Sequence, residues 1–203
     1  MIGIIDYDMG NIQSVLNAFE YLQKKAFIAR TPGELEQAGR IVLPGVGAFS
    51  AGMKNIRGLS LDKSLHEEVI VKKKPFLGIC LGMQLICRES FEFGHHEGLG
   101  WIDASVCRFE KELGVRVPHV GWNDLKIVRK SPLFESAEER PDVYFVHSYY
   151  VNTKNKEDVI ATANYGREFA AVIGRENIFA AQFHPEKSQK AGLGILERFS
   201  EIC

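Results

Sequence analysis

A cysteine between two glycines, placed where an apolar segment gives way to a helix, constrains this chain more than any other feature. The run from Pro75 to Gln84 reads PFLGICLGMQ, with Cys80 at its turn. This strand–turn–helix order is typical of a nucleophile elbow, with Cys in the place that Ser takes in Gly-x-Ser-x-Gly enzymes. Glycine is needed on both sides because a Cβ there would collide with the neighbouring strand or helix. The amides of the following helix would favour the thiolate. The alternative is a buried structural cysteine at a strand end.

One of the six histidines is suited to act as the base that a nucleophilic cysteine requires. His184 follows a short segment rich in Ile, Phe and Ala, which we expect to be a buried strand. Pro185 stops the strand, so His184 lies at its end. Glu186 is two positions further on, and in an extended chain its carboxylate would reach one imidazole nitrogen. The alternative is a histidine that only satisfies its hydrogen bonds within the fold. Together with Cys80, the pattern favours a Cys-His-Glu triad.

A third candidate element is the loop Leu43-Pro44-Gly45-Val46-Gly47-Ala48-Phe49, which follows a short apolar run. Glycines on both sides of Val46 allow its peptide planes to turn, so that an N–H can point at an anion. The amides of Val46 and Gly47 would then complete an oxyanion hole whose first donor is the backbone N–H of Leu81, just after the nucleophile. Most loops of this composition are ordinary turns, which is the alternative here.

These three elements together resemble the class I (triad-type) glutamine amidotransferases. The chain also contains the stretches Ile5-Asp6-Tyr7 with Met9-Gly10-Asn11, Val117-Pro118-His119-Val120-Gly121-Trp122-Asn123, Tyr144-Phe145-Val146-His147-Ser148-Tyr149-Tyr150 and His184-Pro185-Glu186-Lys187-Ser188. These stretches resemble the glutaminase subunits of imidazole glycerol phosphate synthase, and the likeness extends from about Ile2 to Phe199. Asp8 stands where that family often carries Gly, and the loop Gly94-His95-His96 is peculiar to this chain. Neither departure touches a triad position.

The resemblance implies a function, a substrate site and a partner. The chain would hydrolyse glutamine without a cofactor and pass the ammonia to a (β/α)₈ cyclase subunit in histidine biosynthesis. Gln84, Gly47 and Ser148 would contact the glutamine, although a solvated polar residue on a helix is an equal alternative for Gln84. We expect Trp122 in a Gly-Trp-Asn turn, where either a core position or an interface anchor is possible. The family's docking face would comprise Trp122, Asn123, Tyr149, Tyr150 and Lys187.

Bulk properties predict one cytosolic domain spanning residues 1–203. The composition, with 45% apolar and 25% charged residues, is that of an ordinary globular protein, and the net charge of −1 gives no argument for nucleic acid or membrane partners. The N-terminus is predicted to be a first strand rather than a signal peptide. The four cysteines, Cys80, Cys87, Cys107 and Cys203, show no Cys-x-x-Cys spacing, which argues against disulfides and structural zinc. The adjacent His95 and His96 are not expected to share a metal ion.

Strand and helix patterns alternate in the first half of the chain. Strands are predicted at 2–6, 27–30, 41–43 and 76–80, with helices around 12–22, 61–73 and after Cys80. From Trp101 the pattern changes to short alternating runs at 101–109, 124–128, 143–146, 159–163 and 170–174, before a last helix at 192–202. The predicted fold is α/β: an open, mostly parallel twisted sheet with helices on both faces and an antiparallel extension. This is the flavodoxin-like architecture that the resemblance also implies.

Other functions stay open on sequence alone. A cysteine peptidase or acyl hydrolase could use the same triad, but the short chain shows no added loops for an extended substrate. A binding subunit that has lost catalysis is disfavoured by the intact triad. The same glutaminase chemistry could also serve a different synthase, such as an enzyme that amidates surface sugars, because the acceptor site lies on the partner.

Replacing Cys80 by Ser or Ala is expected to abolish glutamine hydrolysis while leaving the fold and partner docking intact. The elbow supplies both the nucleophile and its geometry, and an alcohol ionises far less than a thiol at neutral pH. Steady-state release of glutamate measures the effect. A variant that retained a tenth of wild-type turnover would remove Cys80 from its role.

Overall fold

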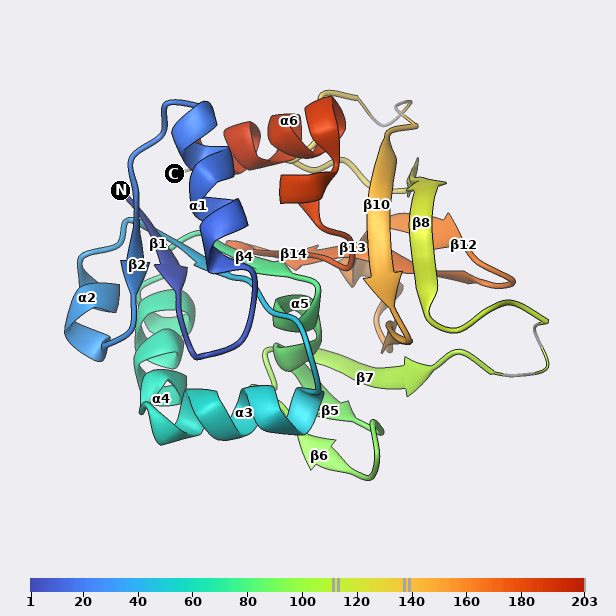
Figure 1. Cartoon of the computed structure of the whole chain (residues 1–203), viewed down its shortest axis with the longest axis horizontal. Helices are drawn as coiled ribbons and strands as arrows, with labels where there is room; N and C mark the ends of the chain where they lie inside the picture. The colour runs from blue at the N-terminus through green and yellow to red at the C-terminus, as the bar shows by residue number, and fades with distance from the viewer. Residues whose placement is uncertain (111, 113, 137, 139, 203) are drawn as a thin grey trace.

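Five parallel strands form the centre of the structure. The computed structural model describes residues 1–110, 112, 114–136, 138 and 140–202. The strands lie side by side in the order β2 (Ala26–Ala29), β1 (Ile2–Ile5), β3 (Arg40–Leu43), β4 (Phe76–Ile79) and β14 (Ile178–Ala181), as Figure 1 shows. Every residue of β1, β4 and β14 is buried, as parallel sheets with both faces covered require.

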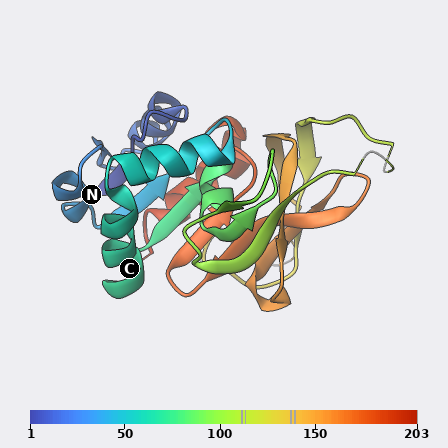
Figure 2. The same cartoon turned by 90° about the horizontal axis from the view of Figure 1, so that it is seen from below.

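Helices cover both faces of this sheet (Figures 1 and 2). On one face, α1 (Ile12–Tyr21) and α6 (Gln189–Phe199) pack against each other and bury Phe19 and Phe199 in one core cluster. On the other face a second cluster is covered by four helices. These are α2 (Pro32–Glu36), α3 (Phe49–Gly58), α4 (Leu61–Leu65) and α5 (Leu81–Leu85).

Antiparallel strands extend the sheet beyond β14, which confirms the predicted fold class. Strand β13 (Glu168–Arg175) pairs with β14 and leads to β11 (Tyr149–Thr153) and β7 (Ile102–Arg108). Four further strands complete this part of the sheet: β5 (Cys87–Ser90), β6 (His96–Glu97), β9 (Lys126–Ile127) and β12 (Val159–Asn164). A 3₁₀ turn at Lys156–Asp158 leads into β12.

Two strands form a separate ribbon over the carboxyl end of the parallel strands. In this ribbon β8 (His119–Asp124) and β10 (Asp142–His147) pair antiparallel, with Tyr144 opposite Trp122 and His147 opposite His119. The prediction that Trp122 lies in a turn is therefore wrong. The sequence Gly-Trp-Asn suggested a turn, but Gly121 takes its positive φ of 138° within a strand that β10 pairs along its whole length.

Several boundaries differ from the sequence prediction. The helix expected at 61–73 is α4 followed by a π-helix at His66–Val71. The last helix begins at Gln189 rather than Gly192 and ends at Phe199. The helices α2 and α3 and strands β5, β6 and β11 were not predicted as elements. No helix within the described residues is long and apolar enough to cross a membrane.

Gly82→Ala is expected to lower the free energy of unfolding by about 2 kcal/mol or more. A Cβ at Gly82 would lie 1.8 Å from the backbone oxygen of Leu43, and neither backbone can yield without disturbing β3 or α5. Urea unfolding measures the change. Gly58→Ala is the matched control, because no atom lies within 4 Å of a Cβ there. Equal stabilities of the two variants would contradict the packing argument.

Candidate active site

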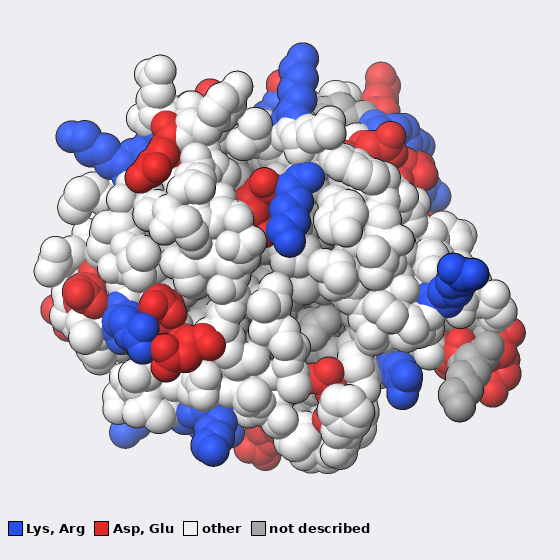
Figure 3. Space-filling view, in the orientation of Figure 1, with Lys and Arg blue, Asp and Glu red and all other residues white. Residues whose placement is uncertain are grey.

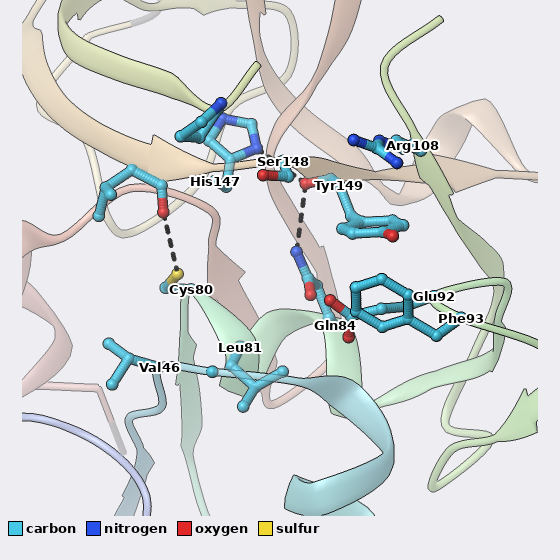
Figure 4. Close-up of a pocket in the computed structure, with 13 residues that line it drawn as sticks. Val46, Cys80, Leu81, Gln84, Glu92, Phe93, Arg108, His147, Ser148 and Tyr149 are labelled. Atoms are coloured by element: carbon cyan, nitrogen blue, oxygen red, sulfur yellow. Dashed lines mark hydrogen bonds between the residues drawn. The ribbon is translucent and has the colours of Figure 1, made fainter.

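Cys80 has the strained backbone that a nucleophile elbow requires. It stands between β4 and α5 with φ 53° and ψ −106°, values that a non-glycine residue rarely adopts. A Cβ on Gly78 would lie 2.8 Å from the Gly82 oxygen, and one on Gly82 would meet Leu43. The predicted need for glycine on both sides of the cysteine is confirmed. The sulfur faces the Val146 oxygen of β10 at 4.0 Å (Figure 4).

His184 and Glu186 are brought together by a tight turn rather than by an extended chain. β14 ends at Ala181, and a 3₁₀ turn, η4, spans Pro185–Lys187. Proline fits the first position of such a turn because it has no N–H to leave unpaired. The imidazole Nδ1 of His184 lies 2.7 Å from Oε1 of Glu186. The expected hydrogen bond is thus present, while the assumed extended backbone is wrong.

The charges around His184 favour its protonated form. Burial alone lowers the pKa of its imidazole, but hydrogen bonding and charge from Cys80 and Glu186 outweigh burial and raise the pKa to about 10. The other ring nitrogen, Nε2, is buried and is directed at Cys80, which together with Glu186 raises the pKa, although it forms no hydrogen bond of good geometry with any described residue. An imidazolium with one nitrogen on a carboxylate and the other directed at the Cys80 sulfur can give up a proton to a leaving group.

The loop from Gly45 to Gly47 lies beside Cys80, and its Gly45 carbonyl is hydrogen-bonded to the residue that follows the cysteine. The N–H of Leu81 donates to the Gly45 oxygen at 3.3 Å, so an internal carbonyl occupies the first predicted donor. Val46 and Gly47 both line the cavity above Cys80, and Gly47 has a φ of 106°. A Cβ on Gly45 would lie 2.1 Å from the Tyr7 hydroxyl, so no larger residue fits there.

A cavity of about 390 Å³ opens beside Cys80, a size suited to a small ligand. Gln84 and Ser148 both line it, as the glutamine-site prediction requires. Gln84 is only 6% exposed, so it is not a solvated helix residue, and its Nε2 donates to the Tyr149 oxygen at 3.2 Å. The full lining is Val46, Gly47, Cys80, Leu81, Gln84, Glu92, Phe93, Arg108, Pro118, Val146, His147, Ser148 and Tyr149.

Two charged residues of the cavity were not singled out from the sequence. Glu92 and Arg108 stand at the end of the cavity away from Cys80 (Figure 4). One Glu92 oxygen accepts the N–H of Phe49 at the start of α3. The signal for Glu92 in the sequence is its place between two phenylalanines, just before Gly94. A negative and a positive group at the same end of a cavity can bind the ammonium and carboxylate of an amino acid.

The residues assigned to a docking face fall into three groups by their exposure. Trp122 is 48% exposed and Lys187 is exposed, and both stand next to β10. The surface over β8 and β10 is mostly uncharged in Figure 3, with Val120 and Val146 exposed beside Trp122. Asn123 is half-buried on the inner face of β8. Tyr149 and Tyr150 are buried, so the structure does not place them on this exposed face.

Within the described part of the chain Cys80, Cys87 and Cys107 are free thiols, and no three metal-ligating side chains are grouped. Cys203 lies outside the described residues.

The family model of class I glutamine amidotransferases matches residues 3–201. The chain belongs to this family. It is 48% identical to imidazole glycerol phosphate synthase subunit HisH 1 of Campylobacter jejuni, and each chain is covered completely. It is 44% identical to subunit HisH 2 of Pseudomonas aeruginosa, again over both full lengths. The HisH subunit of Oceanobacillus iheyensis is 47% identical over 100% of this chain and 99% of its own.

Solved structures agree on the amidotransferase fold. A glutamine amidotransferase crystal structure superimposes with a TM-score of 0.76 at 18% identity, covering 99% of both chains. The glutaminase domain of Trypanosoma brucei CTPS with bound acivicin gives a TM-score of 0.67 at 19% identity, covering 100% of this chain and 94% of its own. Similarity at this level of identity concerns the fold alone.

Nitrogen NMR of this amidotransferase is expected to show His184 as an imidazolium up to a pH near 10. Glu186→Gln should lower its midpoint by roughly one to three pH units, because the carboxylate stabilises the charged ring. Glu197→Gln, an exposed position on α6, should leave the midpoint unchanged. A His184 that loses its proton near pH 6 in the wild type would contradict the charge pairing.

Proposed function

We propose that the chain is the glutaminase subunit of imidazole glycerol phosphate synthase, with Cys80, His184 and Glu186 as its triad. The contact that carries this proposal is the 2.7 Å pair of His184 and Glu186 beside a cysteine held at a nucleophile elbow. Full-length relatives named as subunits of this synthase support it. In its reaction the enzyme converts glutamine to glutamate and ammonia, and the ammonia is used by a (β/α)₈ cyclase.

The triad performs two successive displacements at one carbon. The Cys80 thiolate attacks the carboxamide carbon of the glutamine side chain, and the C–N bond breaks as His184 gives its proton to the departing ammonia. A thioester then joins the sulfur to the glutamyl group. Water loses a proton to His184 and attacks the thioester, so that glutamate leaves and the thiolate returns. Glu186 stabilises the imidazolium at each stage.

The shape and charges of the cavity support glutamine as the substrate. Cys80 stands at one end, and Glu92 and Arg108 stand at the other (Figure 4). A glutamine that places its carboxamide at the sulfur would direct its ammonium and carboxylate toward these charges. Gln84, Gly47 and Ser148 line the space between and are proposed to hold the rest of the molecule.

Docking of the cyclase is proposed to occur on the exposed face of β8 and β10, through Trp122 and Lys187. Lys187 directly follows Glu186, and its N–H donates to the His184 oxygen at 3.0 Å. A partner that contacts Lys187 is therefore one residue from the triad.

We propose that the whole chain, 1–203, acts as one domain. We place it in the cytoplasm, because a nucleophilic thiol needs a reducing compartment.

The ammonia acceptor could be a synthase other than that of the histidine pathway. The Campylobacter and Pseudomonas relatives bear the numerals 1 and 2 in their names, which fits more than one such subunit in an organism. The same triad could then supply a different synthase, such as one that amidates surface sugars. Stimulation by the cyclase of the histidine pathway, encoded in the same genome, distinguishes the two acceptors.

Arg108→Met and Glu92→Gln are each expected to raise the KM for glutamine about tenfold or more while changing kcat less. Each variant removes one charge at the amino-acid end of the cavity and leaves the triad untouched. Glu92→Gln keeps an oxygen to accept the Phe49 N–H, so the start of α3 is preserved. Unchanged KM values in both variants would remove this end of the cavity from substrate recognition.

The isolated chain is expected to hydrolyse glutamine at a small fraction of the rate of the complex. With the Leu81 N–H bonded to the Gly45 oxygen, the hole lacks a free donor, and loss of one donor lowers kcat by about 10²–10³ in a serine protease. Rotation of the Gly45–Val46 peptide on docking would restore it. Glutamate release is measured for the chain alone, with the cyclase, and with the cyclase and its nucleotide ligand. Equal rates in all three would contradict this switch.

A further inference from the structure

Two histidines that the triad does not use form a buried pair on the inner face of the ribbon of β8 and β10, where His147 also lines the glutamine cavity. His119 of β8 and His147 of β10 are 2% and 6% exposed, and Nδ1 of His119 lies 2.9 Å from Nε2 of His147. The ring of His119 stacks on Tyr165 and Phe145 at centroid distances of 3.9 and 4.7 Å. Two imidazoles buried in an aromatic core call for an explanation. Buried polar groups lower the stability of a core unless each of them has a hydrogen-bond partner.

The partners of the pair fix the direction of each hydrogen bond. Nδ1 of His147 lies 2.8 Å from the Tyr149 oxygen, and a carbonyl can only accept, so this nitrogen carries a hydrogen. Burial lowers the pKa of both rings, to about 3 for His147 and about 4 for His119, so both are neutral. Nε2 of His147 must then accept from Nδ1 of His119. Nε2 of His119 is left as an acceptor, and it faces the Asn123 Nδ2 at 3.4 Å.

The chain of hydrogen bonds continues from the Tyr149 oxygen to the nucleophile. That oxygen also accepts from Nε2 of Gln84 at 3.2 Å, and the same nitrogen donates to Oε1 of Gln182 at 3.0 Å. Nε2 of Gln182 lies 3.8 Å from the Cys80 sulfur. Figure 4 shows Gln84 reaching the Tyr149 carbonyl inside the cavity. One continuous series of contacts therefore joins Asn123 on β8 to the lining of the cavity.

We propose that His119 and His147 are positioning residues, which hold the Tyr149 carbonyl, and through it Gln84, in the place that glutamine binding requires. Side chains alternate along β8, so His119 and Asn123 share its inner face while Trp122 lies on the outer one. A shift of β8 on docking would thus reach the glutamine cavity through this pair. The effect on glutamine rests on the proposed function, whereas the hydrogen-bond directions do not.

The directions of the hydrogen bonds are tested first, by nitrogen NMR of the histidine rings in the isolated chain. Both His119 and His147 are expected as the tautomer with hydrogen on Nδ1 and none on Nε2. Addition of the cyclase should shift the ring signals of His147 in the wild type but not in His119→Leu. Hydrogen on Nε2 of either neutral ring, or an equal shift in His119→Leu, would overturn the proposal.

Glutamine kinetics of the complex with the cyclase test the role. His119→Leu and His147→Gln should each raise KM about tenfold with kcat changed less than threefold, because each interrupts the series before Gln84. The KM of the double variant should not exceed that of the more affected single variant, because either substitution alone already interrupts the series of hydrogen bonds. His119→Asn has nearly the size of Leu but keeps a donor toward His147, and it should restore KM to within about threefold of the wild type.

A packing control separates positioning from loss of stability. Phe169 contacts both rings but makes no hydrogen bond with them. Phe169→Leu should lower the melting temperature without raising KM. A tenfold rise in KM in Phe169→Leu, or an unchanged KM in folded His119→Leu, would overturn the proposal. A wild-type complex that forms no glutamate would instead refute the proposed function, and the tautomers would still decide the hydrogen-bond directions.

Discussion

The close approach of Gly82 to the Leu43 oxygen is the constraint on which the site depends. It lets α5 start directly above β3 and β4, so that the turn between strand and helix is as tight as the backbone allows. The turn forces Cys80 into a positive φ and turns its sulfur toward β10. Because the carboxyl ends of β3, β4 and β14 meet at one edge, the glycine loop and His184 reach the same sulfur.

Strand β10 connects the remaining parts of the molecule. On one side it pairs with β8, the strand that carries Trp122. On the other side its Tyr144 oxygen accepts the N–H of His184 at 3.0 Å, and its Tyr144 N–H donates to the Ser188 hydroxyl at 3.0 Å. Its last residues, Val146 and His147, line the cavity. A two-stranded ribbon is only marginally stable by itself, so the position of β8 and β10 depends on these contacts to His184 and Ser188.

Much of the fold, and the placement of Cys80, His184 and Glu186, could be predicted from sequence, because strong local patterns specify them. The apolar strands, the paired glycines around Cys80 and the short spacing from His184 to Glu186 are all visible within ten residues. What could not be predicted depends on distant partners. Trp122 is in a strand only because β10 lies beside it, and the pairing of His119 with His147 joins residues 28 positions apart. Arg108 reaches the cavity from β7, which no local pattern reveals.

The bond from Leu81 to Gly45 makes the resting site selective among reagents that attack thiols. A compound that reacts by simple displacement, such as a small alkyl halide, needs no help at a carbonyl oxygen and meets only the open side of Cys80. In the proposed mechanism a glutamine analogue that passes through a tetrahedral adduct would need the Leu81 N–H, which already donates to the Gly45 oxygen at 3.3 Å. In that mechanism the Gly45 carbonyl of the protein's own backbone thus competes with the substrate oxygen for the Leu81 N–H.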